Sequence, residues 1–427
     1  MTTITVVASG SRGDVQPYLA LAQGLQRAGY TVRLVSSDNF ATLAAEAGLE
    51  FGSLGFSAEE RLQSDEWRKR IEGGNFLKIL RGMQSEMKGA AADMAHRLPP
   101  LLDGSDVIVT GVAGTGGVFT LAEQGKVPVI QAYVFPFTPT TEFPAPIVTQ
   151  LPLGMVLNPL SFRVLHQMFW QMSKAGDGAV RREIGLGKPP FWGPFRALDR
   201  SQTPVLYGYS AHVLPRPRDW SERYTLTGYW FLDEPAGWQP PTDLVDFLNA
   251  GDPPVYIGFG SMGSRKPEEA GQIALEALRR SGQRGVLASG WGGLQPADLP
   301  ASVYLITALP HSWLFPRMAA VVHHGGAGTT AAGFRAGVPS ILVPFGLDQP
   351  FWGSRAVALG VGTRPIPRKQ LTGERLGAAI TEAVTNPTLR RQAADLGQKI
   401  RAEEGIAQAV AVIDRFTQRT PAAYSLP

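Results

Sequence analysis

The sequence of 427 residues contains no cysteine, so it can form no disulfide, no thiolate metal site and no cysteine nucleophile. No apolar run is long enough to span a bilayer, and the best stretch, residues 151–160, is interrupted by Pro152 and Pro159. The start has no cationic segment followed by an apolar run, so we expect no secretory leader. These absences favour a cytoplasmic protein, with peripheral contact to a membrane as an open alternative.

The chain also has little excess of charge of either sign. The 40 lysines and arginines are almost balanced by 36 aspartates and glutamates, a formal charge of +4 that gives no reason to expect nucleic acid as a partner. No Asp-x-Asp pair and no Walker lysine occurs, so the sequence offers no device for chelating a nucleotide-bound cation. We therefore expect no metal and no cofactor.

Short β-branched runs alternate with helix-length segments, a pattern that indicates parallel sheets. The runs fall into two groups, at 4–9, 31–37, 106–111 and 127–134, and at 255–260, 284–290, 303–308, 319–324 and 340–345. Two α/β lobes are predicted, with an N-terminal lobe over 1–228, a proline-rich and glycine-rich linker over 229–243, and a C-terminal lobe over 244–403. A last helix within 404–427 is expected to pack back on the N-terminal lobe.

The loop ASGSRGDVQP, residues 8–17, follows the first predicted strand. Gly10 and Gly13 match two positions of a dinucleotide fingerprint, but Asp14 would repel a pyrophosphate at the start of the helix. At the mouth of a cleft the same carboxylate can accept a proton from a hydroxyl. The alternative is that Asp14 caps a helix beginning near Gln16, and the loop alone leaves both open.

A second glycine-rich loop, HHGGAGTT at 323–330, ends a strand and opens a helix that runs to about Ala336. Its free amides, with the hydroxyls of Thr329 and Thr330, form a cradle for a phosphate without a metal. His323 and His324 are adjacent on a strand and point to opposite faces, which argues against joint metal ligation.

Two further loops lie at the same predicted sheet edge. GFGSMGS at 258–264 presents Ser261, either to a distal phosphate or simply within a turn. VPFGLDQPFWG at 343–353 presents Asp348 and Gln349, whose acceptors and donors suit adjacent sugar hydroxyls. Asp348 can also serve as a helix N-cap, and the two roles are compatible.

The segment 135–172 is rich in aromatic side chains and poor in charge. It either walls an apolar pocket or packs on the core of the first lobe. The residues concerned are Phe135, Phe137, Phe143, Phe162, Phe169 and Trp170.

Together these motifs resemble the UDP-sugar-dependent glycosyltransferases of the GT-B fold, and most of all their sterol glucosyltransferase branch. The antibiotic-aglycone glycosyltransferases are similar too. The likeness rests on residues 10–18, 254–262, 309–315, 323–333 and 343–353, with Gly346 as an interposed residue, and it covers essentially the whole chain.

The resemblance implies two Rossmann-like lobes with parallel sheets that face a central cleft, the first binding a lipophilic acceptor and the second a nucleotide sugar. It implies inverting transfer of a hexose, glucose from UDP-glucose, to the hydroxyl of a sterol or similar polycyclic molecule. Macrolide, polyketide, flavonoid or lipid acceptors remain alternatives. So do a nucleotide-sugar epimerase of the same fold, a dinucleotide oxidoreductase and a silent binding subunit.

Residue by residue, the resemblance makes Asp14 the general base. The diphosphate would be met by Ser261, His323, Gly326, Gly328 and Thr329. Asp348 and Gln349 would hold the sugar, Leu309 and Trp313 would border the base, and Phe135, Phe137, Phe143, Phe169 and Trp170 would line the acceptor pocket. Ala331 stands where plant-type relatives have a ribose-binding glutamate, which leaves the choice between uridine and thymidine donors open.

Overall fold

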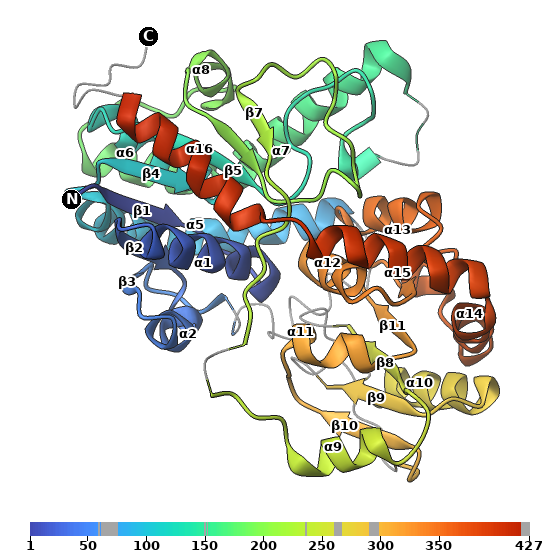
Figure 1. The fold of residues 1–427 in the computed structure, drawn as a ribbon. Coiled ribbons are helices and arrows are strands. Elements are labelled where there is room, and N and C mark those ends of the chain that lie inside the picture. The colour runs from blue at the N-terminus through green and yellow to red at the C-terminus, as the bar shows by residue number, and fades with distance from the viewer. Residues whose placement is uncertain are drawn as a thin grey trace.

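The chain folds into two α/β lobes joined by a linker and by the last helix (Figure 1). The structure is a computed structural model that describes residues 1–58, 60, 76–148, 151, 153–234, 237–259, 267–289 and 299–419. No helix in the described ranges is long and apolar enough to cross a membrane.

The N-terminal lobe is built on a seven-stranded parallel sheet of order β3-β2-β1-β4-β5-β6-β7. Its strands are β1 Thr3–Val7, β2 Thr31–Ser36, β3 Glu50–Ser53, β4 Val107–Thr110, β5 Val129–Tyr133, β6 Val205–Tyr207 and β7 Tyr224–Leu226. The central strand β1, with the sequence TITVV, is buried on both faces, as its β-branched run predicts.

Helices cover both faces of this sheet. Ile4 and Val6 of β1 share a core with α1 and α16, whereas Val7 shares the opposite core with α5, α6 and α7. The helices of this lobe are α1 Arg12–Arg27, α2 Ala41–Glu46, α5 Phe76–Leu102, α6 Val118–Gln124, α7 Gly154–Glu183 and α8 Phe195–Arg200, with short 3-10 turns at Asp38–Phe40, Val112–Gly116 and Pro146–Val148.

The C-terminal lobe repeats the plan with a five-stranded parallel sheet of order β10-β9-β8-β11-β12. Its strands are β8 Val255–Gly258, β9 Gly285–Ala288, β10 Val303–Ile306, β11 Ala320–His323 and β12 Ser340–Leu342. Its helices are α9 Thr242–Asn249, α10 Pro267–Ser281, α11 His311–Leu314, α12 Ala327–Ala336, α13 Gln349–Ala358, α14 Gly373–Thr385 and α15 Pro387–Arg401, with 3-10 turns at Phe315–Arg317 and Arg368–Gln370.

Helix α16, Gly405–Arg419, leaves the C-terminal lobe and lies beside α1 (Figure 1). Its Ile406 fits so closely over Gly24 of α1 that a Cβ on this glycine would lie 2.2 Å from the isoleucine. Ala409, Val412 and Ile413 of α16 are part of the core beneath β1. The end of the chain therefore ties the two lobes together.

The predicted two-lobed fold is confirmed, and all nine predicted strands are present. Strands β3, β6 and β7 were not predicted from the sequence. One boundary was wrong: α1 begins at Arg12 rather than near Gln16, because Ser11 already serves as its N-cap.

Candidate active site

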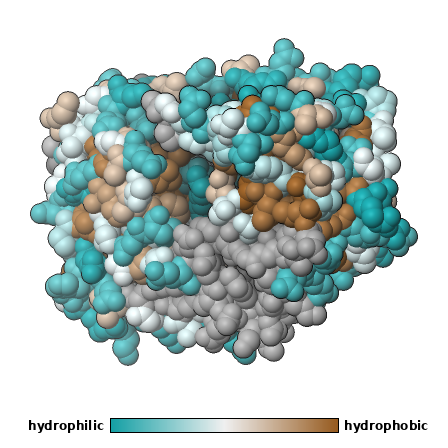
Figure 2. Space-filling view, turned by 90° about the horizontal axis from the view of Figure 1, so that it is seen from below, coloured by the Kyte–Doolittle hydropathy of each residue, from teal (hydrophilic) through white to brown (hydrophobic). Residues whose placement is uncertain are grey.

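A cavity of about 1750 Å³ lies between the lobes, at the carboxyl ends of both sheets. Single-ligand sites usually measure roughly 300–1,000 Å³, so this cavity has room for two substrates. It is lined from the N-terminal lobe by residues after β1 and on α7, and from the C-terminal lobe by residues after β11 and β12. Seen from below, the molecule is hollowed, with hydrophobic side chains on both sides of the hollow (Figure 2).

Asp14 lies in the first turn of α1 and lines the cavity. Its Oδ2 accepts two hydrogen bonds of 2.8 Å from Ser11, one from the backbone amide and one from the hydroxyl. The carboxylate folds back over Gly10, where a Cβ would lie 2.6 Å from Oδ2 and where φ is +135°, so this position requires glycine. Asp14 thus completes the capping box of α1 while facing the cleft.

The pKa of Asp14 is raised above its ordinary value. Desolvation is the main cause: the carboxylate is open to the cavity, but both lobes exclude bulk water around it. The hydrogen bonds from Ser11 favour the charged form and offset part of this effect. A raised pKa makes this carboxylate a stronger base than an aspartate in water.

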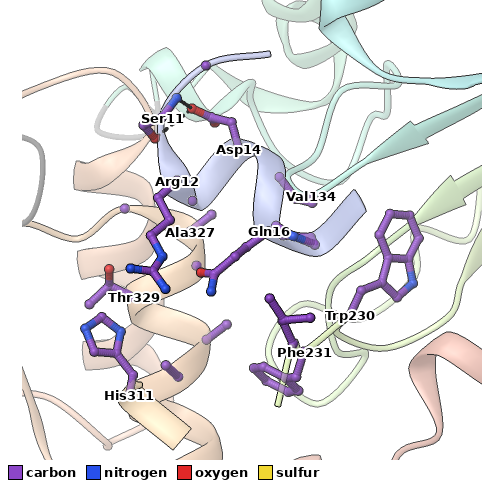
Figure 3. Close-up of a pocket in the computed structure, with 18 of the residues that line it drawn as sticks. Ser11, Arg12, Asp14, Gln16, Val134, Trp230, Phe231, His311, Ala327 and Thr329 are labelled. Atoms are coloured by element: carbon purple, nitrogen blue, oxygen red, sulfur yellow. Dashed lines mark hydrogen bonds between the residues drawn. The ribbon is translucent and has the colours of Figure 1, made fainter. Parts of the chain in front are cut away.

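Arg12 extends from the start of α1 toward Thr329 and His311 on the opposite lobe (Figure 3). Its positive charge contributes to lowering the pKa of His311 to about 3, after the larger effect of burial. The N-terminal lobe therefore places a cation at the glycine-rich loop of the C-terminal lobe.

The glycine-rich loop after β11 ends at Gly326, the N-cap of α12. Gly326, Ala327, Gly328 and Thr329 all line the cavity, and no side chain caps this helix or places an acid in its first turn. A Cβ on Gly328 would lie 3.5 Å from the Cα of Gly13, so the starts of α1 and α12 face one another across the cleft. The open start of α12 and the guanidinium of Arg12 favour an anion at this point.

Three imidazoles lie behind the cradle, and burial lowers the pKa of each. His324 lines the cavity, and its pKa falls to about 4. His323 is fully buried and lies behind the surface of the cavity, so its predicted contact with a diphosphate stays a prediction. Its Nδ1 accepts from the amide of Gly325 at 3.1 Å, because the strand alternation turns His323 inward and His324 outward.

Asp348 and Gln349 lie at the start of α13 and line the cavity opposite Asp14. Asp348 accepts a 2.9 Å hydrogen bond from the indole of Trp352. The pKa of Asp348 is raised to about 6, mainly by burial and to a smaller extent by the negative charge of Asp14. Gln349 uses Oε1 to accept from the amide of Phe345 at 2.7 Å, so its side chain is held in place.

The loop before α13 is strained. Leu347 has a φ of +57°, a left-handed conformation that is uncommon for a leucine, directly after the interposed Gly346. Such strain persists where the surroundings fix the chain, and it is concentrated at functional sites.

The apolar wall of the cavity comes from one face of α7 and from neighbouring loops. Phe135 and Phe169 line it as predicted. Phe137, Phe143 and Trp170 do not, which corrects three of the predicted acceptor residues. Phe137 and Trp170 are almost completely buried in the core, and Phe143 packs against it.

Two other predictions have different outcomes. Leu309 lines the cavity, but Trp313 turns away from it, with its ring 4.4 Å from the guanidinium of Arg317. Trp238, whose ring centre is 5.6 Å from that of Trp313, lines the cavity instead. Ser261 lies outside the described residues.

Sequence reasoning missed several lining residues: Arg12, Trp230, Phe231, Trp238 and His311. Trp230 and Phe231 belong to the predicted linker, where the run YWF was a signal of burial rather than of a free connection. Arg12 belongs to the loop at 8–17, in which only the glycines and Asp14 carried predictions.

No group of three histidine, aspartate or glutamate side chains that could hold a metal occurs in the part of the chain that the structure describes. The charged side chains that line the cavity include Arg12, Arg27, Arg335 and Arg401 and the carboxylates of Asp14, Glu46, Asp233, Glu234 and Asp348.

Two family models match the chain. Residues 4–144 match the glycosyltransferase family 28 N-terminal domain, and residues 293–412 match the erythromycin biosynthesis protein CIII-like C-terminal domain. The first model falls within the N-terminal lobe, and the second covers much of the C-terminal lobe and the first half of α16.

Curated relatives match both lobes. A sterol 3-beta-glucosyltransferase of Arabidopsis thaliana is 36% identical over 417 residues, which are 95% of this chain but 64% of that protein. The chain thus spans less than two thirds of this longer relative. O-mycaminosyltylonolide 6-deoxyallosyltransferase of Streptomyces fradiae is 34% identical over 431 residues, 99% of both chains.

Solved structures share the fold. A kitacinnamycin glycosyltransferase covers 100% of this chain and 99% of its own, with a TM-score of 0.67 and 22% identity. A calicheamicin glycosyltransferase covers 98% and 99%, with a TM-score of 0.65 and 20% identity. The chain belongs to the glycosyltransferases of the GT-B fold, in the family that includes the sterol 3-beta-glucosyltransferases and the antibiotic glycosyltransferases.

Proposed function

We propose that this enzyme transfers glucose from UDP-glucose to the hydroxyl of a sterol or related polycyclic acceptor, with inversion and without a metal. The observation that carries the proposal is the division of the cavity. One end is polar, with Asp14 facing Asp348 and the start of α12, and the other is walled by Phe135, Phe169 and further apolar side chains. A nucleotide sugar suits the first end and a flat lipophilic acceptor the second.

The reaction is a single displacement. The acceptor oxygen forms a bond to the anomeric carbon while its proton passes to the carboxylate of Asp14, and the bond from that carbon to the diphosphate oxygen breaks. The electron pair leaves with the nucleoside diphosphate. Because the acceptor attacks from the side opposite the leaving group, the configuration at the anomeric carbon inverts.

Negative charge grows on the leaving diphosphate as this bond breaks. The amides at the start of α12, the hydroxyl of Thr329 and the guanidinium of Arg12 would stabilise it in the role that a divalent cation fills in metal-dependent transferases. His323 offers one further hydrogen-bond donor. Because its Nδ1 accepts from Gly325, its Nε2 carries the proton, and this atom is buried without a partner in the described structure. A small shift on donor binding would let a phosphate oxygen accept it.

A macrolide is the second candidate acceptor. The Streptomyces relative, whose name describes transfer to a tylonolide, matches this chain end to end, whereas the sterol relatives are longer. The volume of the cavity accommodates either acceptor beside a nucleotide sugar.

The test is a transfer screen of the purified enzyme with UDP-glucose and thymidine diphosphate glucose against sterols, flavonoids and macrolides. Glucoside formation on a sterol with UDP-glucose, unchanged by excess EDTA, is the expected result. Transfer only to macrolides would replace the acceptor, and activity that collapses on chelation and returns with magnesium would remove the electrostatic role of α12 and Arg12.

A further inference from the structure

Exposed apolar side chains are concentrated on one segment of the N-terminal lobe. Eight of the thirteen large apolar side chains that are largely exposed in the described structure lie between residues 151 and 192. They are Leu151, Met155, Val156, Leu157, Leu160, Val164, Phe191 and Trp192, here called the α7 patch. Isolated exposed apolar residues are ordinary, but a contiguous group marks an interaction surface.

The α7 patch is continuous along the helix. Residues 155–157, 160 and 164 lie on its outer side, with Val156 87% exposed and Met155 71% exposed. One turn beyond Val164, Gln167 donates a 3.1 Å hydrogen bond to the carbonyl of Phe191. The exposed rings of Phe191 and Trp192 meet edge to face at 4.9 Å, so they extend the same surface.

Helix α7 has a second apolar face, which points inward. Leu165, Met168, Phe169 and Met172 of this helix line the cavity. The helix lies on the side of the sheet opposite α16 (Figure 1), so its outer face is not covered by the element that closes the other side. One helix therefore separates the exposed patch from the apolar end of the cavity.

Charge distinguishes the kind of partner. Residues 151–200 contain seven lysines and arginines but three aspartates and glutamates, so this segment alone has the formal charge of +4 that the whole chain has. Two of these cations flank the aromatic end of the patch: Lys174 lies 5.7 Å from the ring centre of Phe191, and Arg196 lies 5.5 Å from that of Trp192. Apolar residues, an exposed tryptophan and a rim of cations are the composition that binds the interface of an anionic bilayer.

We propose that the α7 patch docks this enzyme on the surface of an anionic lipid bilayer. Apolar side chains at the start of α7 enter the boundary between headgroups and acyl chains, while Lys174 and Arg196 contact the headgroups. The reason for such docking rests on the proposed function: a lipophilic acceptor resides in the bilayer and reaches the cavity along the inner face of α7. The binding itself requires neither donor nor acceptor.

Flotation with vesicles tests the docking without any reaction. Full-length enzyme, with no sugar donor present, is mixed with vesicles of equimolar phosphatidylcholine and phosphatidylglycerol or of phosphatidylcholine alone. We expect the enzyme to float with the anionic vesicles, less with the neutral ones, and less as salt is added. The double variant Val156→Ser with Leu160→Ser should bind at least about tenfold more weakly.

Two matched variants separate docking from general effects. Val357→Ser with Leu305→Ser removes exposed apolar side chains from the C-terminal lobe and should float like the wild type. Lys174→Gln with Arg196→Gln should weaken binding to anionic vesicles by about fivefold per charge, whereas Arg390→Gln with Arg391→Gln on α15 should not. Unchanged melting temperature and UDP affinity in all four show that the fold is intact.

The proposal is overturned if the wild type stays with the unbound protein, or if the Val156 and Leu160 variant floats as well as the wild type does. If the wild type sediments as a dimer and the Val156 and Leu160 variant as a monomer, the patch is an interface with a second copy instead. Flotation without transfer activity would leave the docking standing and remove the proposed function. Transfer to a detergent-dispersed sterol without flotation would do the reverse.

Discussion

Helices α1 and α12 begin opposite one another in the cleft, but their first turns are satisfied in different ways. In α1, the third helical residue is Asp14, which accepts two hydrogen bonds from the N-cap Ser11. In α12, the third helical residue is Thr329, the N-cap is Gly326, and the first turn contains no acid. One helix start contains its own anion, whereas the other has none, and the proposed function places the diphosphate of the donor there.

Replacing the built-in anion of α1 should have the largest effect. Asp14→Asn keeps the size of the side chain and can still accept from Ser11, but it can no longer take a proton. We expect the transfer rate to fall by roughly 10² to 10⁴, with UDP affinity and melting temperature near those of the wild type. Near wild-type turnover with a working acceptor would end the assignment of Asp14 as the base.

Asp14→Ala separates the two roles of this carboxylate. It removes both the base and the capping acceptor, so it should add a loss of about 0.5–2 kcal/mol in the free energy of unfolding to the loss of rate. If Asp14→Asn keeps the wild-type rate and Asp14→Ala loses only stability, Asp14 acts only through the fold.

Placing a carboxylate in the first turn of α12, as α1 has in Asp14, should have the next largest effect, a loss of UDP affinity. Thr329→Asp places a carboxylate at the same helical position as Asp14, where it can cap the helix but repels the diphosphate. We expect UDP to bind about 100-fold more weakly in calorimetry, while the melting temperature stays constant or rises slightly. Thr329→Asn is the matched control, and equal affinities for UDP in the two variants would show that α12 does not meet the phosphates.

The contrast between these two helix starts was only partly readable from the sequence. Glycines after a strand predicted both loops, and the alternating runs predicted both sheets, because spacing along the chain reports local geometry. The sequence could not show that Gly13 and Gly328 lie against each other, since 315 positions separate them and only the packing of the lobes brings them together.

The acceptor wall shows the same limit. Aromatic content identified the segment 135–172, but it did not separate Phe135 and Phe169, which line the cavity, from Phe137 and Trp170, which fill the core. All four have the same chemistry, and which face of the segment turns inward depends on partners elsewhere in the chain. Trp170, for example, is fixed by a 3.0 Å hydrogen bond to the carbonyl of Pro190.

Replacing Asp348 should have a smaller effect, which is measured as a change in the free energy of unfolding with pH. Its pKa of about 6 in the folded protein lies above its ordinary value of 3.8, so the folded state binds the proton more tightly than the unfolded state does. Stability is therefore lost as the pH rises from about 4 to about 6, and the full cost is present above that range. Asp348→Asn, which keeps an acceptor for Trp352, should be more stable than the wild type by about 1–3 kcal/mol at pH 7, and by nearly nothing below pH 4.

Chemical unfolding of the two proteins at a series of pH values measures this difference. The transfer rate of Asp348→Asn should fall even as its stability rises, because the sugar loses a charged acceptor. If the free energies of unfolding of the wild type and of Asp348→Asn change in parallel with pH, the carboxylate of Asp348 is not desolvated in the cleft.

Arg12 should give the smallest of the four effects and the finest distinction between the two helix starts. It is the first helical residue of α1, yet its side chain reaches toward Thr329 and so adds its charge to the start of α12 (Figure 3). Because charge on the diphosphate grows during the reaction, Arg12→Gln should lower kcat by about tenfold and UDP-glucose affinity by less. Arg390→Gln, on the surface of α15, is the control for a lost positive charge. A loss of donor affinity with kcat unchanged would mean that Arg12 only holds the nucleotide sugar, and that the opening of α12 alone stabilises the leaving group. No change in either quantity would remove Arg12 from the donor site, and the start of α12 would then be the remaining candidate for stabilising the leaving group.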